Sequence, residues 1–349
     1  MEQTNECAET RESPEHMRMS LSTAMWLDYK PGKFMRNAES WCINLLLTYN
    51  EGCYANCAYC GLARKREGRY EDKSFIHVGW PVHPTAEIIK RIDERSEKIK
   101  RTCISMVTNK RSIGDTVEIT GELKKGTTVP VSVLASPTII TKADMEAFHN
   151  TGADKIGIAV DAATQELFMQ LRGKGVSGPH NWDTYWERIR DSVEVFGPEN
   201  VGVHLVVGLG ETERDMISTM QRVRDYGAAT QLFSFLAEPG SAMKDCPQPE
   251  LGHYRRMQLG RHLIDGGIAT AGQFKFDDSG KLTSYGVEDT KLDEVINSGE
   301  PFRTSGCIGE DGEVACNRPY ANTIIPEIRN YPFKPRAHDV EKIRSEIWL

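Results

Sequence analysis

Six short apolar segments that alternate with longer amphipathic segments predict an α/β fold. The predicted strands cover residues 43–49, 102–107, 129–135, 155–160, 201–208 and 230–236. The predicted helices cover residues 84–99, 142–151, 164–172, 183–196, 212–226 and 250–266. Buried strands that alternate with helices pair in parallel through right-handed crossovers. The six units therefore predict either a doubly wound sheet or an incomplete barrel.

The turn after the first predicted strand helps to choose between these two architectures. No G-x-G-x-x-G pattern follows residues 43–49, which disfavours a dinucleotide-binding sheet. Three cysteines follow instead, within the stretch CYANCAYCGL at residues 53–62. In a parallel barrel the reactive groups lie on the loops after the carboxyl ends of the strands. The position of the cysteines therefore favours the barrel.

The two ends of the chain differ from its centre. Residues 1–37 begin with a polar, acidic stretch and are expected to be a lead-in to the barrel. The barrel itself is expected to span residues 38–270. From residue 271 to residue 349 the pattern weakens into segments rich in Gly, Pro, Asp and Asn, which predicts an extension that closes the bottom of the barrel.

Composition narrows the class of protein. The formal net charge of −7 argues against a nucleic-acid-binding surface, and no apolar run approaches the ~20 residues of a membrane span. The chain holds nine cysteines, an odd number that does not suit a secreted disulfide framework. We therefore expect a cytoplasmic protein that binds neither nucleic acid nor membrane, in which clustered cysteines serve metal binding or catalysis.

Cys53, Cys57 and Cys60 have the spacing C-x3-C-x2-C. Three thiolates can hold three irons of a [4Fe–4S] cluster and leave the fourth iron open. Tyr59, between the second and third cysteine, suits a tight loop against a flat ligand. A structural zinc site normally needs a fourth Cys or His nearby, and the nearest histidine, His77, lies well downstream. Zinc binding and chance clustering are the alternatives.

This triplet after the first strand of a (βα)6 pattern resembles that of the radical S-adenosylmethionine (SAM) superfamily. The resemblance implies a partial TIM-like barrel and a [4Fe–4S] cluster whose open iron binds the amino and carboxylate groups of SAM. It also implies that an external electron donor reduces the cluster. Reductive cleavage of SAM would then give a 5′-deoxyadenosyl radical that abstracts hydrogen from the substrate.

Further positions are expected to bind SAM by the same resemblance. Asp161 ends the fourth predicted strand, where the biotin synthase carboxylate accepts hydrogen bonds from the SAM ribose; a helix N-cap is the alternative. Arg188 lies in YWERIRDSVEVFG, which resembles the helix whose arginine pairs with the SAM carboxylate, although a solvated arginine is equally expected there. Gly208 lies in the Gly-rich turn of VGVHLVVGLGETERD, which would hold the adenine and ribose or form only a strand-to-helix turn.

Thr108 and Asn109 follow the second predicted strand in VTNKRS. They are the candidates there for contacts with the amino group of SAM.

The remaining cysteines suggest a second site. Cys42 and Cys103 stand near the starts of the first two strands, at the bottom of a barrel. Strand one spans about seven residues of ~3.3 Å each, so Cys42 lies on the order of 20 Å from the triplet and cannot complete the first cluster. With Cys307 and Cys316 from the extension, four thiols could converge on an auxiliary cluster. Buried free cysteines that act as small hydrophobic residues are the alternative.

Segments along residues 35–335 resemble one branch of the superfamily more closely. INLLLTYNEGCYANCAYCGLARKREG, VPVSVLASPT, LVVGLGETE, EPGSAM and SGC…ACNRPYAN resemble the biotin-synthase-related proteins, which include the subunits of the archaeal-type two-component lipoyl synthase. This resemblance implies sulfur insertion at C6 or C8 of a protein-bound octanoyl group, with sulfur from an auxiliary [4Fe–4S] cluster. It implies an octanoylated carrier protein or peptide as substrate and a second radical SAM subunit as partner.

Two alternative functions stay open at this point. One is a radical SAM enzyme of different chemistry, such as biotin-synthase-like sulfur insertion, methylation or a carbon-skeleton rearrangement, with structural cysteines in the extension. The other is a zinc-stabilised binding protein that uses the triplet and a remote ligand.

Overall fold

A curved sheet of eight strands forms the centre of the computed structural model, which describes residues 11–324 and 327–349. The strand order is β3-β1-β2-β4-β5-β6-β7-β8. Six strands run parallel in chain order, namely β2 (Cys42–Leu47), β4 (Arg101–Ser105), β5 (Val131–Ala135), β6 (Ala153–Asp161), β7 (Val201–Val207) and β8 (Ala229–Ser234). All six predicted strands are confirmed. Because β8 does not pair with β2, the strands form the predicted partial TIM-like barrel.

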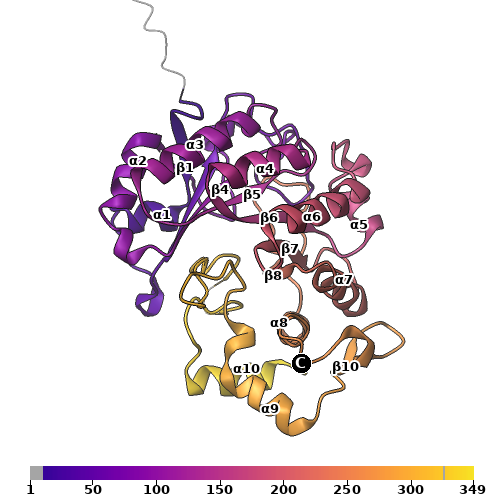
Figure 1. Ribbon diagram of the computed structural model, residues 1–349. Coiled ribbons are helices and arrows are strands. Elements are labelled where there is room, and N and C mark those ends of the chain that lie inside the picture. The colour runs from indigo at the N-terminus through magenta and orange to yellow at the C-terminus, as the bar shows by residue number, and fades with distance from the viewer. Residues whose placement is uncertain (1–10, 325–326) are drawn as a thin grey trace, which may run out of the picture.

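Helices cover the outer face of these strands (Figure 1). They are α2 (Thr85–Asp93), α3 (Ser112–Gly126), α4 (Lys142–Thr151), α5 (Gln165–Leu171), α6 (Trp182–Phe196), α7 (Glu213–Asp225) and α8 (Leu251–Asp265). Six of them were predicted, and α3 was not. The buried face of α3 alternates Thr116 and Thr120 with Ile119 and Leu123, so polar threonines hide its helical period from the sequence.

The first described residues belong to the sheet. Strand β1 (His16–Met19) pairs antiparallel with β2 and with β3 (Val82–Pro84), and helix α1 (Leu21–Trp26) follows it. Met17 and Met19 are fully buried there. Residues 16–27 of the expected lead-in over residues 1–37 are therefore part of the sheet and its core, whereas residues 28–37 are mostly exposed. Residues 1–10 lie outside the described part of the chain.

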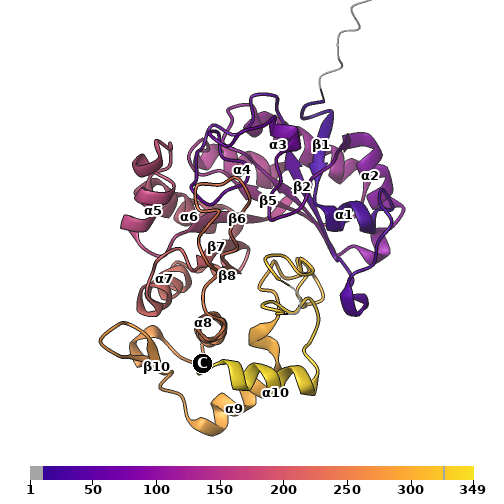
Figure 2. The ribbon, with the colours of Figure 1, turned by 180° about the vertical axis from the view of Figure 1, so that it is seen from behind.

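The C-terminal extension packs beneath the barrel and against α8 (Figure 2). It contains β9 (Lys275–Phe276), β10 (Leu282–Ser284), α9 (Asp289–Ser298) and α10 (Ala337–Glu346). Two buried arginines of α8 bind this extension. Arg255 pairs with Glu346 at 2.9 Å, and Arg256 donates to the carbonyl of Ile347 at 2.6 Å.

No helix within residues 11–324 and 327–349 is both long and apolar enough to cross a membrane.

Candidate functional site

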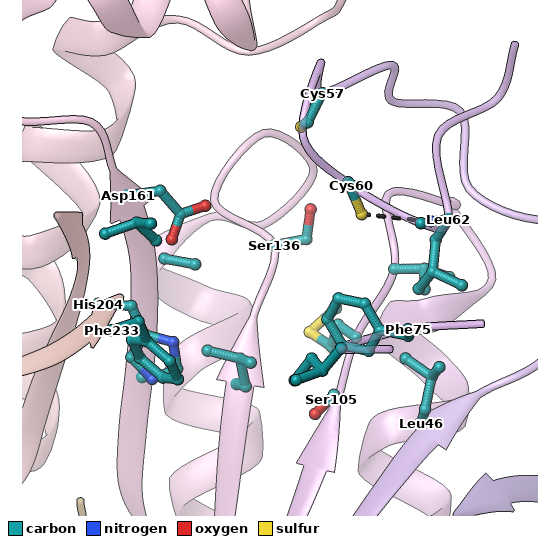
Figure 3. A pocket seen from close by; sticks show the side chains of 18 of the residues that line it. Leu46, Cys57, Cys60, Leu62, Phe75, Ser105, Ser136, Asp161, His204 and Phe233 are labelled. Atoms are coloured by element: carbon teal, nitrogen blue, oxygen red, sulfur yellow. Dashed lines mark hydrogen bonds between the residues drawn. The ribbon is translucent and has the colours of Figure 1, made fainter. Parts of the chain in front are cut away.

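The six parallel strands enclose a cavity of about 290 Å³. Successive residues of a strand point to opposite faces, so alternate residues reach the cavity. The lining includes Asn44 and Leu46 from β2, Cys103 and Ser105 from β4, Ser132 and Leu134 from β5, Gly157 and Ala159 from β6, His204 and Val206 from β7, and Gln231 and Phe233 from β8. Figure 3 shows Cys57 and Cys60 at one end of this space, with Leu46, His204 and Phe233 further inside. The cavity therefore runs along the inner face of the barrel.

Cys53, Cys57 and Cys60 lie together on the loop after β2 and line one end of the cavity. Backbone hydrogen bonds fix this loop from three sides, because Tyr54 binds Thr108, Ala58 binds Leu171 and Met243 binds Ala58. Burial raises the pKa of the thiols of Cys57 and Cys60. The structure thus brings the three predicted cysteines together at the predicted rim of the barrel.

The same loop needs a glycine after the third cysteine. A Cβ at Gly61 would stand 2.2 Å from the carbonyl oxygen of Ser74 and 2.9 Å from the side chain of Glu238. Glu238 is buried and accepts hydrogen bonds from the Ser74 hydroxyl at 2.5 Å and from the backbone of His77 at 2.8 Å. Glu238 belongs to the predicted motif EPGSAM, so this motif packs the loop after β8 against the cysteine loop.

Tyr59 and Asp161 meet beside the triplet. The phenol of Tyr59 donates to a carboxylate oxygen of Asp161 at 2.5 Å, and the guanidinium of Arg172 lies 3.3 Å from the same oxygen. All three residues line the cavity. Asp161 has a positive φ of 63°, which carboxylate and amide residues adopt more readily than others. It precedes the N-cap of α5, which is Thr164, so Asp161 is not a helix cap.

Arg188 does not reach the cavity. On α6 its guanidinium forms ion pairs with Asp191 and, at 3.2 Å, with Glu187. The charge of Arg188 is therefore neutralised on the outer face of the barrel. The guanidinium that lines the cavity near the triplet is that of Arg172, which we did not predict as a SAM contact. Its signal in the sequence is the segment RGKGVSGPHNW at residues 172–182, which begins with this arginine.

His180 is a second cavity residue that sequence reasoning missed. Its Nδ1 lies 2.6 Å from the hydroxyl of Thr138 and 3.0 Å from the hydroxyl of Tyr185. Burial, helped by the charge of Arg172, lowers the pKa of His180 to about 2, so its ring is neutral. Tyr185 also accepts from Arg172 at 3.4 Å. The hydroxyl of Tyr185 therefore connects Arg172 with His180.

The other predicted SAM contacts divide into two groups. Thr108 lines the cavity, with its hydroxyl 3.0 Å from that of Ser136. Asn109 lies outside the lining, and its amide instead donates to the carbonyl of Gly52 at 3.3 Å. Gly208 also lies outside; its φ of 102° and its hydrogen bond to Glu211 at 2.7 Å form the turn between β7 and α7. Gly208 thus forms a strand-to-helix turn, which is the alternative to a SAM contact that the sequence left open.

The four remaining predicted cysteines gather at the other end of the cavity. Cys103, Cys307 and Cys316 line it, and Cys42 lies behind them, with its Sγ and that of Cys316 each 3.9 Å from Oδ1 of Asn44. The neighbouring thiol of Cys42, helped by the charges of Arg318 and Arg101, lowers the pKa of the Cys316 thiol. The four thiols thus lie at one end of the cavity, and their ligation of an auxiliary cluster stays a prediction.

A hairpin places Cys307 next to Cys316 despite the eight residues between them. Ile308 bridges Val314, and the amides of Ala315 and Cys316 both donate to the carbonyl of Cys307, at 2.9 and 3.2 Å. Ser305 docks this segment on the edge of β8, where its hydroxyl accepts from the amide of Leu232 at 2.7 Å. The hairpin thus carries both thiols into the open side of the barrel.

Buried donors without partners occur at both ends of the cavity. Within the described chain, Nε of Arg172 near the triplet, and Nε of Arg101 and of Arg318 near the second thiol group, are buried and make no hydrogen bond. A buried donor left unpaired costs about 1–3 kcal/mol, so such atoms suit a site that takes an anionic group. Thiolate-bound clusters and the carboxylate of SAM are groups of this kind, so the residues present fit them.

The donor side chains do not form a preassembled site for a single metal ion in the described part of the chain. Among residues 11–324 and 327–349, no three His, Cys, Asp or Glu side chains converge closely enough to hold one ion. Zinc requires about four ligands within roughly 2.0–2.3 Å of one point. A [4Fe–4S] cluster binds each thiolate through a different iron and so tolerates wider spacing.

A curved parallel sheet with three cysteines on its first loop defines a class of radical enzyme, and sequence comparison agrees. Residues 47–223, which are half of the chain, match the family model described as the radical SAM superfamily. The chain therefore belongs to the radical SAM superfamily. Membership implies a [4Fe–4S] cluster and SAM, for which Cys53, Cys57 and Cys60 are the matching ligands. No curated protein sequence matches the chain significantly.

Solved structures share the fold at low sequence identity. Methylornithine synthase (PylB) is 14% identical, has a TM-score of 0.50 and is matched over 70% of this chain and 66% of its own. HydG, a maturase of the [FeFe]-hydrogenase, is 15% identical, has a TM-score of 0.48 and is matched over 64% of this chain and 50% of its own. The chain thus spans about two thirds of one relative and half of the other. The likeness to PylB confirms the partial barrel.

Proposed function

We propose that this radical SAM enzyme inserts sulfur into an acyl chain, as lipoyl synthases do, at C6 or C8 of a protein-bound octanoyl group. One observation carries the proposal: a single cavity has the cysteine triplet at one end and a second group of cysteines at the other. When bound, the first cluster and SAM supply a hydrogen-abstracting radical, and an auxiliary [4Fe–4S] cluster supplies sulfur.

The residues between the two thiol groups suit an alkyl chain. Leu46, Leu134, Val206 and Phe233 project into the cavity, and an apolar wall excludes water from reactive species. Cys42 and Leu47 mark the ends of β2, which at ~3.3 Å per residue separates them by about 17 Å. An octanoyl chain would span much of this length, with one end near each thiol group.

The charged residues lie at the ends of the cavity. Asp161 and Arg172 stand beside the triplet, where we assign them to SAM, and Arg318 stands beside Cys316. Burial lowers the pKa of His204 to about 3, so the histidine in the inner wall is neutral. An uncharged acyl chain would therefore contact only uncharged side chains between the two ends of the cavity.

The partners remain part of the proposal. An octanoylated carrier protein or peptide would present the chain, a second radical SAM subunit would perform the other insertion, and an external donor would supply the electron. The loop over residues 172–182 is the candidate for contact with the carrier.

The test is anaerobic incubation with SAM, dithionite and an octanoyl-lysyl peptide, followed by mass spectrometry. We expect a thiolated octanoyl product and about eight irons per chain, since each cluster holds four. Deoxyadenosine without any thiolated product, even with a second subunit added, would contradict sulfur insertion and favour another radical SAM chemistry.

A paired substitution sharpens this test. Cys307→Ala with Cys316→Ala should lower the iron content to about four and abolish thiolation, while SAM cleavage persists. Cys246→Ala is the matched control, because Cys246 is exposed and does not line the cavity. Full thiolation by the double variant would show that the cysteines of the extension are only structural.

A further inference from the structure

The amide of Gln231 contacts the second thiol group. Gln231 lies on β8, is 7% exposed and lines the cavity. Its Nε2 lies 3.4 Å from Sγ of Cys307 and donates to it. A sulfur bound to iron has no proton of its own, so an N–H group is the kind of partner that it accepts.

The neighbouring strand is shaped to admit this amide. A Cβ at Gly202 on β7 would stand 2.2 Å from Nε2 of Gln231 and 2.9 Å from its Cδ. His204, two residues further along β7, lies opposite Gln231 in the strand pair, and both side chains line the cavity. Gly202 and His204 therefore hold the amide in the orientation that reaches Cys307.

We infer that Gln231 is a positioning residue for the auxiliary cluster, and that its amide hydrogen bond to the Cys307 sulfur raises the reduction potential of that cluster. This inference rests on the proposed function, since it requires the second cluster. Hydrogen bonds to ligand sulfurs stabilise the more electron-rich, reduced state of an iron–sulfur cluster, and outer-sphere partners of this kind typically change metal affinity or activity 10–100-fold.

The experiment isolates the second cluster from the first. A variant with Cys53→Ala, Cys57→Ala and Cys60→Ala removes the triplet, so that any remaining cluster belongs to the second site. The measurement is iron and sulfide content, followed by a redox titration monitored by electron paramagnetic resonance. Neither readout requires turnover.

Three substitutions are then added singly to this background. Gln231→Leu removes the donor at similar length, Gln231→Glu replaces it with a carboxylate, and Gly202→Ala displaces the amide without altering Gln231. We expect each to shift the reduction equilibrium at least tenfold toward the oxidised cluster, which is about 59 mV for one electron. Gln170→Leu, on the exposed face of α5, is the matched control and should leave the potential unchanged.

The outcomes separate the two proposals. A triplet-free background that binds no iron would overturn the second cluster and this inference together. A background with about four irons whose potential is the same in all three variants would overturn the role of Gln231 alone. If Gln231→Leu does not fold, Gly202→Ala still tests whether the amide of Gln231 changes the reduction potential, because this variant keeps the glutamine.

Discussion

At the scale of single residues, Asp161 links the cysteine loop to the rest of the cavity. Its carboxylate accepts from Tyr59 and faces Arg172, both beside the triplet. The sequence placed Asp161 correctly, because strand ends in parallel barrels share one rim. For Arg188 the alternative of a surface arginine describes its position, because helical periodicity does not distinguish an arginine that faces inward from one paired on the outer surface.

Asp161→Asn should weaken SAM binding at least tenfold while preserving the fold. Asparagine tolerates the positive φ at this position, so the loss would come from the carboxylate charge rather than from backbone strain. Anaerobic equilibrium dialysis with labelled SAM measures the affinity. Asp191→Asn, which removes the partner of Arg188 on the outer face, is the control; equal weakening by both would contradict a specific role for Asp161.

Asp265 provides a pH-dependent prediction. Burial raises the pKa of its carboxyl group to about 6. A raised acid pKa in the folded state favours the protonated form, so the stability that Asp265 contributes is complete below pH ~4 and is lost as the pH rises to about 6. At about 1.36 kcal/mol per pKa unit, the loss is roughly 3 kcal/mol.

Urea unfolding of the cluster-free protein between pH 4 and 7 tests this. Asp265→Asn should lack the decrease in free energy of unfolding between pH ~4 and ~6 that the natural chain shows. If the two curves stay parallel over this range, the pKa of Asp265 is not raised.

At the scale of elements, buried ion pairs join α7 and α8 to the extension. Glu213 opens α7 and binds the guanidinium of Arg256 on α8 at 2.6 Å, while also accepting from the amide of Leu282 at 2.7 Å. Both side chains of the pair are at most 6% exposed. The segments 212–226 and 250–266 were predicted as helices from their periodicity, but their pairing could not be, since no sequence pattern states which buried charges meet.

Glu213→Ala should lower the free energy of unfolding by about 3–5 kcal/mol, because it leaves Arg256 buried without a carboxylate. Chemical denaturation measures the change. Glu294→Ala, which breaks an exposed pair with Lys291 on α9, is the control and should change stability by less than ~1 kcal/mol. Similar effects of the two substitutions would show that the Glu213 pair is solvated.

At the scale of the whole molecule, the cavity joins two groups of cysteines that are far apart in the sequence. Ala159 on β6 is partly exposed to this cavity. Ala159 lies between Asp161 at the rim and the inner wall of the cavity. A large side chain at this position would block the path of a long substrate.

Ala159→Phe should abolish thiolation of the octanoyl peptide while SAM cleavage without substrate turnover persists. The added ring fills the passage but contacts no predicted cluster ligand. Mass spectrometry of both products, together with iron content, measures the effect. Ala143→Phe on the exposed surface of α4 is the control. Unchanged thiolation by Ala159→Phe would show that the substrate does not pass through the cavity.

The sequence by itself determined the alternation of strands and helices, the rim position of Cys53, Cys57 and Cys60, and the class of enzyme. These features are local, since strand period, helix period and cysteine spacing act over a few residues. The tertiary structure decided which distant groups meet: β1 in the sheet, Arg172 and His180 in the cavity, and the hairpin that brings Cys307 and Cys316 to Cys103. Such contacts depend on the packing of whole elements around one core, and the spacing of residues along the chain does not encode them.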